Sequence, residues 1–222
     1  MTTFSDPAAV ARYTDGPVRM VPGFVHMQRM AAILLAENAP AQARMLVLGA
    51  GGGLELQVLA DAQPDWTFAG VDPSAEMLDL ARQTTAAHSA RIDLYHGYID
   101  TAPAGPFDGA TCLLTLHFIP RDDRLATLRA LHARLKPGAP LVVAHHSIPV
   151  QDRTQWLYRF AAFAAASGAP MADPAQTVAT LGARLPILTP DEDQDLMVQA
   201  GFTNVSLFYA AFTFRGWVGY AG

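Results

Sequence analysis

The sequence has almost no cysteine and almost no lysine. Cys112 is the only cysteine among the 222 residues, which excludes an internal disulfide. It lies in the apolar segment 110–114, so we expect a buried small side chain and not a nucleophile. Lys136 is the only lysine, and the arginines are scattered without a basic run. These patterns give no indication of a nucleic-acid-binding surface, and we do not expect nucleic acid as a partner.

Long apolar runs are missing as well. No uninterrupted stretch approaches the roughly eighteen residues that a membrane-spanning helix needs. The first six residues lack the basic and apolar regions of a signal peptide, so we expect a cytoplasmic protein with no membrane partner. The composition is 51% hydrophobic and 16% charged, which is typical of an ordered globular chain. The formal charge of -5 and the lack of basic clusters favour a small-molecule partner.

The sequence does contain a regular alternation of short apolar strands and helices. Residues 44–48 predict an apolar strand, residues 54–62 predict a helix, and the pattern repeats to residue 145. The later predicted strands are 66–71, 92–95, 109–116 and 141–145, and the later predicted helices are 74–87 and 121–135. This alternation predicts an α/β fold, in which a mostly parallel sheet is covered by helices on both faces.

Further segments flank this alternating core. Asp6-Pro7 is typical of a helix start, and apolar spacing predicts a helix over residues 21–38. After residue 146 we expect helices at 151–167 and 173–181, followed by a helix that opens with a capping box at Thr189-Pro190-Asp191-Glu192. The strands predicted at 204–209 and 211–214 are too close for a crossover helix, so they must pair as an antiparallel hairpin at the sheet end.

Nothing in the sequence marks a boundary between domains. We find no internal repeat, charge block or low-complexity linker. We therefore expect residues 1–222 to form a single domain, with residues 1–40 as an N-terminal helical lid and residues 147–188 as a helical insertion.

A glycine loop, Gly49-Ala50-Gly51-Gly52-Gly53, separates the first strand of the core from its helix. Glycine lets the backbone approach a ligand, and the start of a helix offers unpaired N–H groups. The loop can also be only a tight turn, but its place and glycine content favour a ligand site. A dinucleotide fingerprint would need glycine where this chain has Leu54, so a nicotinamide-dependent oxidoreductase is the weaker alternative.

The second strand ends at Asp72, about twenty residues beyond the glycine loop, and Pro73 follows it. A carboxylate at this place can accept hydrogen bonds from both hydroxyls of a ribose, which suits an adenosine cofactor. The alternative is that Asp72 only caps the helix that Pro73 begins.

Together with Leu135-Lys136-Pro137-Gly138 and Ala200-Gly201-Phe202, these residues resemble the class I S-adenosylmethionine-dependent methyltransferases. The resemblance covers roughly residues 45–146 and the closing hairpin. It implies a Rossmann-like sheet, S-adenosyl-L-methionine as the cofactor, and in-line methyl transfer to a small-molecule acceptor. The glycine loop would hold the methionine part, Asp72 the ribose, and the residues after the third strand the adenine. The cofactor-binding residues expected on this basis are Phe24, Gly49, Ala50, Gly51, Gly53, Asp72, Pro73, Tyr98, Ile99 and Asp100.

Two positions depart from that family's pattern. Val47 stands where an acid usually precedes the glycine loop, and the acid of the adenine loop is either replaced by Tyr98 or displaced to Asp100. Glu55 could partly replace the charge that is missing at Val47. The departures keep open a second alternative, a non-catalytic module that only binds an adenosine cofactor.

A narrower likeness concerns the tRNA uridine carboxymethyltransferases, which use carboxy-S-adenosylmethionine. It rests on Val21-Pro22-Gly23-Phe24, on Thr115-Leu116-His117-Phe118 and on the final hairpin. The arginine and asparagine expected for the extra carboxylate of that cofactor fall on Thr180 and Leu113, with Arg184 close by. A carboxy-S-adenosylmethionine-dependent tRNA-modifying enzyme is therefore a disfavoured alternative.

Histidines are the candidate general bases. His117 follows the fourth strand, and His145 and His146 end the fifth, where ligands bind in parallel sheets. Neighbours on a strand point to opposite faces, so at most one of the latter pair faces the site. We take His117 and His145 as candidates, although each is also explained as a buried structural histidine. No Cys/His cluster has metal-ligand spacing, so no metal is expected.

The acceptor must be covered by segments outside the common core, because the glycine loop and Asp72 leave the region beyond the fourth and fifth strands for it. Trp156, Tyr158 and Arg159 lie on one predicted helix of the insertion and, with Phe24, are the candidate acceptor-binding residues. Packing would explain the same aromatic residues. These patterns leave the acceptor's identity and the oligomeric state open.

Overall fold

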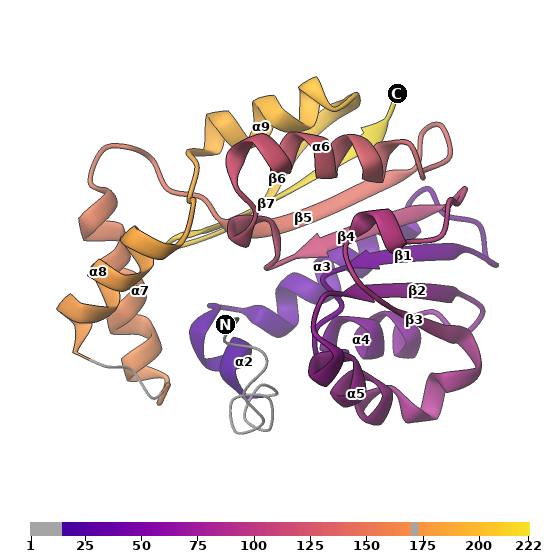
Figure 1. Ribbon diagram of the computed structural model, residues 1–222, viewed down its shortest axis with the longest axis horizontal. Helices are drawn as coiled ribbons and strands as arrows, with labels where there is room; N and C mark the ends of the chain where they lie inside the picture. Colours follow the sequence, from indigo (N-terminus) through magenta and orange to yellow (C-terminus); the bar gives the residue numbers. More distant parts are fainter. Residues whose placement is uncertain (1–14, 170–172) are drawn as a thin grey trace.

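The computed structural model describes residues 15–169 and 173–222, which contain a seven-stranded sheet in the order β3-β2-β1-β4-β5-β7-β6 (Figure 1). The mutually parallel strands are β1 (Arg44–Leu48), β2 (Thr67–Asp72), β3 (Ile92–His96), β4 (Gly109–Leu113) and β5 (Pro140–His146). The antiparallel strands of the closing hairpin are β6 (Phe202–Ala211) and β7 (Phe214–Ala221), and β7 also pairs with β5. The predicted fold class is confirmed.

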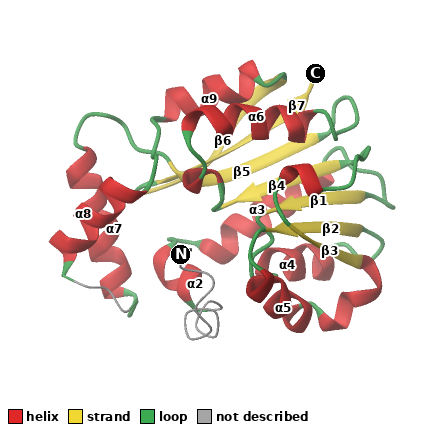
Figure 2. Ribbon diagram, viewed as in Figure 1, coloured by secondary structure: helices red, strands yellow, loops and turns green. Residues whose placement is uncertain are grey.

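Helices cover both faces of this sheet (Figure 2). Those on one face are α3 (Phe24–Ala36), α4 (Leu54–Ala62) and α5 (Ala75–Thr84), and those on the other are α6 (Arg121–His132) and α9 (Pro190–Gln199). Strand residues alternate between the two layers, since Val47 packs in the core with α3 and α4 and Leu46 in the core with α6 and α9. Each strand therefore needs apolar residues in succession, which is the pattern in the sequence.

Three helices of the described residues lie beyond the end of β5 (Figure 1). They are α2 (Gly16–Met20), α7 (Arg153–Ala166) and α8 (Pro174–Arg184). Arg19 on α2 donates a hydrogen bond to the carbonyl oxygen of Gly168, 2.8 Å away, just after α7. No helix in the described part of the chain is long and apolar enough to cross a membrane.

The segment that carries α7 and α8 leaves and rejoins the sheet at one place. Ser147 and Leu188 form an isolated parallel bridge, and the N–H of Ile148 donates to the carbonyl oxygen of Leu188 at 3.0 Å. The side chains of Ile148, Leu157 and Ile187 are buried together in a small cluster of their own. The segment with these two helices is therefore attached to the rest of the fold at two neighbouring residues, Ser147 and Leu188.

Several predicted elements have the right extent. The strand 44–48 and the helix 54–62 are confirmed, and the capping box is formed, because Thr189 Oγ1 accepts from the Glu192 N–H at 3.2 Å and Glu192 Oε2 accepts from the Thr189 N–H at 2.9 Å. The predicted helix start at Asp6-Pro7 lies outside the described residues.

Several predicted boundaries are wrong. The helix expected over 21–38 starts only at Phe24, because Gly23 takes a left-handed conformation with φ of 69°. The strand expected over 109–116 ends at Leu113, because Leu114 has φ of 56°. The last strand, expected over 211–214, begins at Phe214 and runs to Ala221, since the hairpin turn lies at residues 212–213.

Candidate active site

A cavity of about 520 Å³ opens at the carboxyl ends of four adjacent parallel strands. This volume is within the range of about 300–1,000 Å³ typical of small-molecule and cofactor pockets. Its lining includes the residues that follow β1, β2, β3 and β4, namely Gly49–Gly51, Pro73–Ser74 after Asp72, Gly97–Ile99 and Leu114–Thr115. Ligands of parallel α/β sheets bind at this edge.

Gly49 allows two walls of the cavity to approach each other. Its φ of 79° favours glycine, and a Cβ added at this position would overlap the Thr115 side chain, which follows β4. The N–H groups of Gly49 and Ala50 both donate to the carbonyl oxygen of Val71, at 2.8 and 3.0 Å. The backbone of the loop is therefore fixed by the sheet and close to the opposite wall, as a ligand loop requires.

Gly53 has a different place in the loop. It is not among the lining residues, and a Cβ added to it would lie 2.9 Å from the Cα of Ala81 on α5. Its φ of 84° also favours glycine. The sequence placed Gly53 with the cofactor, whereas in the structure it allows α4 to begin close against α5.

Asp72 joins the glycine loop to the start of α5. Its Oδ2 accepts a hydrogen bond from the Gly51 N–H and its Oδ1 accepts one from the Ser74 N–H, each at 2.9 Å. Since a carboxylate has about four acceptor sites, both oxygens can accept a further bond from the cavity. The helix cap is Ser74, whose Oγ accepts from the Met77 N–H at 3.2 Å. Asp72 is therefore not the cap of α5.

Burial raises the pKa of Asp72, although the Ser74 and Gly51 N–H groups and the nearby His96 oppose that rise. Asp72 is 9% exposed and lines the cavity, so a polar ligand group can reach it. The residues after β3 lie beside it. Tyr98 and Ile99 line the cavity, whereas Asp100, the third residue expected there, does not.

The side of the cavity beyond β4 is mostly apolar. Phe24 on α3 lines it together with Leu114, Phe118 and Ile119. Leu114 lies in the left-handed region, which is strained for a leucine and is frequent at functional sites. Sequence reasoning placed only Phe24 here. Leu114 belongs to the segment predicted as a strand over 109–116, and Phe118 and Ile119 lie just beyond that segment.

Glu55 is a buried acid in the same cavity. It is the second residue of α4, and it is 7% exposed. Its Oε1 makes no hydrogen bond with any described residue. Burial raises the pKa of Glu55 to about 8, despite a smaller lowering effect from the nearby Thr111 hydroxyl.

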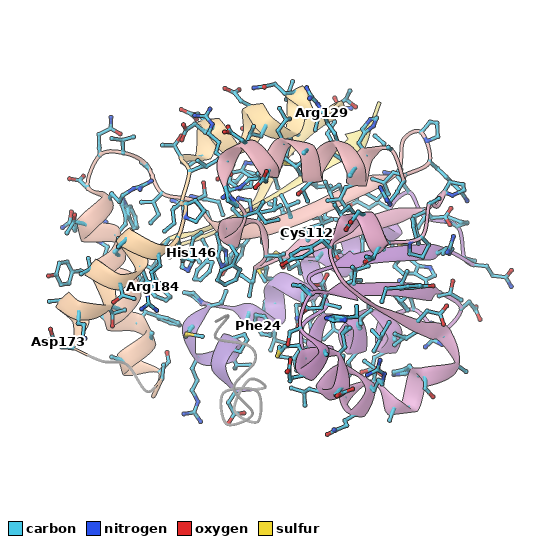
Figure 3. All side chains as sticks on the ribbon, in the orientation of Figure 1. Phe24, Cys112, Arg129, His146, Asp173 and Arg184 are labelled. Atoms are coloured by element: carbon cyan, nitrogen blue, oxygen red, sulfur yellow. The ribbon has the colours of Figure 1, made fainter. Side chains whose placement is uncertain are left out.

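The candidate base His117 lies behind the cavity wall. It is buried and is not a lining residue, and its Nδ1 accepts from the His146 N–H at 3.3 Å. Burial, with smaller effects from His146, His145 and Arg124, holds the pKa of His117 well below its usual range. Burial and then His145 lower the pKa of His146 to about 3. Figure 3 shows His146 at the end of the sheet nearest α7 and α8.

The other candidate base, His145, belongs to a buried polar cluster on the opposite layer. Asp193 Oδ1 accepts from Arg124 Nη1 at 2.7 Å and lies 3.1 Å from His145 Nε2. These three side chains join β5 to α6 and α9, and none of them lines the cavity. In the structure His145 therefore contributes to packing between β5 and α9 and lies away from the cavity.

The predicted acceptor residues of the insertion also lie outside the cavity lining. Arg159 stacks its guanidinium over the Trp156 ring at 4.3 Å, and Arg215 of β7 lies 5.9 Å from the same ring. Tyr158 is 43% exposed. Trp156 also packs against the small apolar cluster of this segment, so packing accounts for its position.

Comparison with known proteins gives a consistent assignment. A family described as a methyltransferase domain matches residues 46–141, which run from β1 into β5. The carboxy-S-adenosyl-L-methionine synthase of Chromohalobacter salexigens is 30% identical over 224 residues, covering 97% of this chain and 82% of that protein. This chain belongs to the class I S-adenosylmethionine-dependent methyltransferase superfamily.

Solved methyltransferases share the fold. An O-methyltransferase family protein from Burkholderia thailandensis aligns with a TM-score of 0.70 at 16% identity, covering 99% of this chain and 61% of that one. Human N-acetylserotonin methyltransferase, solved in complex with S-adenosylmethionine, gives a TM-score of 0.66 at 16% identity, with coverage of 99% and 57%. This methyltransferase thus spans about three-fifths of the length of these two structures, and at such identities the likeness concerns the fold alone.

S-adenosylmethionine is the cofactor of this methyltransferase, and the cavity fits it. The molecule combines a ribose diol, an adenine ring and an amino acid part that bears an ammonium group. The cavity offers free acceptor sites on Asp72, a closely approaching backbone at Gly49–Gly51 and a buried Glu55 carboxyl group whose Oε1 has no hydrogen-bond partner among the described residues. Among the described lining residues, Asp72 and Glu55 are the only acids.

Proposed function

We propose that this enzyme transfers the methyl group of S-adenosylmethionine to a small, predominantly apolar acceptor that lies beyond β4. The observation that carries this proposal is that one cavity extends from Asp72 to Phe118 and Ile119. One end suits the adenosine part of the cofactor, and the other is walled by apolar side chains. No described lining residue is lysine, arginine or histidine, which disfavours an acceptor with a phosphate or carboxylate group at this end.

In this proposal each strand end holds one part of the cofactor. Asp72 accepts hydrogen bonds from the ribose hydroxyls, and Gly49–Gly51 lie along the methionine part. Tyr98 and Ile99 enclose the adenine. Support comes from the common cavity and from the acceptor sites that remain on Asp72.

The chemistry needs alignment more than it needs a protein-derived base. When bound, S-adenosylmethionine supplies an electrophilic methyl group on a positively charged sulfur. The acceptor's lone pair would form the new bond to carbon while the carbon–sulfur bond breaks with its electrons kept by sulfur, and the acceptor's proton would pass to solvent. Phe24, Leu114 and Phe118 would hold the acceptor on the line of this displacement and exclude water. We assign no catalytic role to His117 or His145, because neither lines the cavity.

We also propose that the N-terminal helices, within the segment 1–40, act as the lid of the acceptor side. Phe24 at the start of α3 lines the cavity, and Figure 3 shows it beside the region between α2 and the sheet. The segment 147–188 lies next to α2 through the Arg19 contact, so it would act on the acceptor through α2. Both belong, in this proposal, to the same domain as the sheet.

A second candidate function is the formation of carboxy-S-adenosyl-L-methionine, and the name of the Chromohalobacter relative favours it. That product bears an additional carboxylate, which would need a cation or several donors. Thr180 and Arg184 on α8 are exposed and lie outside the cavity lining, and Leu113 in the lining is apolar. These three positions therefore disfavour the second candidate and the use of carboxy-S-adenosylmethionine on tRNA.

One experiment separates these functions. The purified protein is incubated with methyl-labelled S-adenosylmethionine and a small-molecule metabolite extract, and all products are followed by mass spectrometry. Our proposal predicts S-adenosylhomocysteine together with a labelled small molecule. A nucleoside that is heavier than the cofactor by carbon dioxide would establish the second candidate instead, and cofactor binding without turnover would contradict both.

A further inference from the structure

The described cavity lining contains two acids, Asp72 and Glu55. The proposed function gives Asp72 a role but gives none to Glu55. Asp72 has both carboxylate oxygens engaged by backbone N–H groups, whereas Glu55 Oε1 has no hydrogen-bond partner among the described residues. Leaving a polar atom buried and unpaired costs about 1–3 kcal/mol. A folded protein tolerates such a group most readily where a bound ligand supplies the missing hydrogen bond.

The position of Glu55 can be derived from the sheet register. Its carboxyl group lies near the Thr111 hydroxyl on β4, and Thr111 is the register partner of Val47 on β1. Val47 and the α4 residues Leu56 and Leu59 belong to the same core layer. The Glu55 carboxyl group therefore lies under the start of the glycine loop, between the ends of β1 and β4.

We propose that the Glu55 carboxylate binds the α-ammonium group of the cofactor's methionine part. The inference rests on the proposed placement of the cofactor, in which that part follows Gly49–Gly51. An ammonium group taken out of water needs an anion and hydrogen-bond acceptors. Glu55 supplies both beside the glycine loop, and the side chains that α3 contributes to the lining, Phe24 and Gln28, are neutral.

Binding is then coupled to the release of a proton. With its raised pKa, Glu55 holds a proton in the free protein at pH 7, and a bound ammonium group would favour the ionised form. Cys112 on β4 interacts electrostatically with Glu55, and burial raises the pKa of Cys112 strongly. The other acid of the described lining is Asp72 at the end of β2. The α5 side chain in the lining is Met77, which does not titrate.

The test compares two ligands by isothermal titration calorimetry. S-adenosylhomocysteine carries the ammonium group without the charged sulfur, and 5′-methylthioadenosine lacks the amino acid part. In wild type at pH 7, we expect binding of S-adenosylhomocysteine to release up to one proton, read from the dependence of heat on buffer ionisation enthalpy. The substitution Glu55→Gln should weaken that binding about tenfold or more and abolish the proton release, with 5′-methylthioadenosine affinity unchanged.

The matched control is Glu37→Gln, which alters an exposed glutamate at the end of α3 and should behave as wild type. Equal weakening of both ligands by Glu55→Gln, or no weakening of S-adenosylhomocysteine, overturns the inference while the proposed cofactor site stands. If wild type binds neither ligand, the proposed site itself fails, and the inference with it.

A measurement on wild type alone covers the case in which Glu55→Gln does not fold. Release of one proton per ligand corresponds to a tenfold gain in affinity per pH unit. Between pH 6 and 7 the affinity for S-adenosylhomocysteine should therefore rise by up to tenfold relative to that for 5′-methylthioadenosine. Parallel pH dependences of the two ligands overturn the inference.

Discussion

The hydroxyl of Tyr209 on β6 donates a hydrogen bond to the carbonyl oxygen of Pro22, two residues before α3. Tyr209 is buried and shares a core layer with Val21 and Phe24. The antiparallel end of the sheet thus holds the turn from which Phe24 enters the cavity. This contact links the closing hairpin, which lies outside the cavity, to the proposed acceptor side of the site.

Replacing Tyr209 with phenylalanine should loosen that turn. Loss of one hydrogen bond is worth about 0.5–1.5 kcal/mol, and the Pro22 carbonyl oxygen would lose this partner. We expect Tyr209→Phe to lower the free energy of unfolding in urea by that amount and to reduce methyl transfer more than cofactor affinity. Tyr220→Phe is the control, because the Tyr220 hydroxyl makes no hydrogen bond with the described residues. Identical turnover in the two variants would contradict the proposed link.

Gly49 and Gly138 provide a matched pair of substitutions. Both have positive φ, 79° and 77°, but an added Cβ would overlap Thr115 at Gly49 and meet nothing within 4 Å at Gly138. Gly138→Ala should therefore cost about 1 kcal/mol of stability from backbone strain alone. Gly49→Ala should cost a further 1–3 kcal/mol or so from overpacking and should also abolish measurable cofactor binding. Urea unfolding measures the stability and calorimetric titration measures the cofactor affinity. Similar results for both variants would contradict the prediction that a side chain at position 49 blocks cofactor binding.

Asp72→Asn tests the ribose site. The substitution removes the charge that the Gly51 and Ser74 N–H groups and, in our proposal, the ribose hydroxyls share. We expect affinity for S-adenosylhomocysteine to fall about tenfold or more, since hydrogen bonds to a charged acceptor are worth about 1.5–3 kcal/mol. Asp65→Asn, at an exposed aspartate just before β2, should leave affinity unchanged. Wild-type affinity in a folded Asp72→Asn protein would mean that the Asp72 carboxylate only stabilises the glycine loop and does not bind the ribose.

The buried carboxyl of Glu55 should make the ligand-free protein less stable as pH rises. Its pKa is about 8 in the folded protein and about 4.5 in an unfolded chain, so over this interval only the folded state retains the proton. Stability then decreases by at most about 1.4 kcal/mol per pH unit from this group. Urea unfolding between pH 5 and 8 should show this slope in wild type and in Glu37→Gln, and a flatter dependence in Glu55→Gln. Parallel curves for the three proteins would contradict the raised pKa.

The core of the fold could be predicted because local signals and tertiary structure agree there. The helix 54–62 follows a glycine in the left-handed region and carries buried Leu56 and Leu59, so its limits are encoded locally. The last strand could not be placed, because it contains Gly216 and Gly219, which are unfavourable in strands on propensity alone. In the structure both glycines make room for neighbours, and a Cβ on Gly216 would lie 2.8 Å from Phe208.

In the site, too, features with a local sequence signal could be predicted and features set by tertiary contacts could not. The glycine loop and Asp72 were predictable, because their chemistry is visible in a few adjacent residues. The apolar wall was not, because Leu114 leaves the strand only where its N–H donates to the carbonyl oxygen of Ala144 on the neighbouring strand. No local pattern in the sequence records such a contact. For the same reason the histidines could be placed near strand ends but not behind the wall of the cavity.

The adjacent attachment points of the segment between Ser147 and Leu188 have an evolutionary consequence. Because this excursion begins and ends at one backbone bridge, its length can change without moving either β5 or α9. The cofactor-binding edge, built from β1 to β4, is independent of it. Such an arrangement lets natural variation or laboratory recombination exchange the segment that carries α7 and α8 between homologues while every described residue that lines the cavity stays the same.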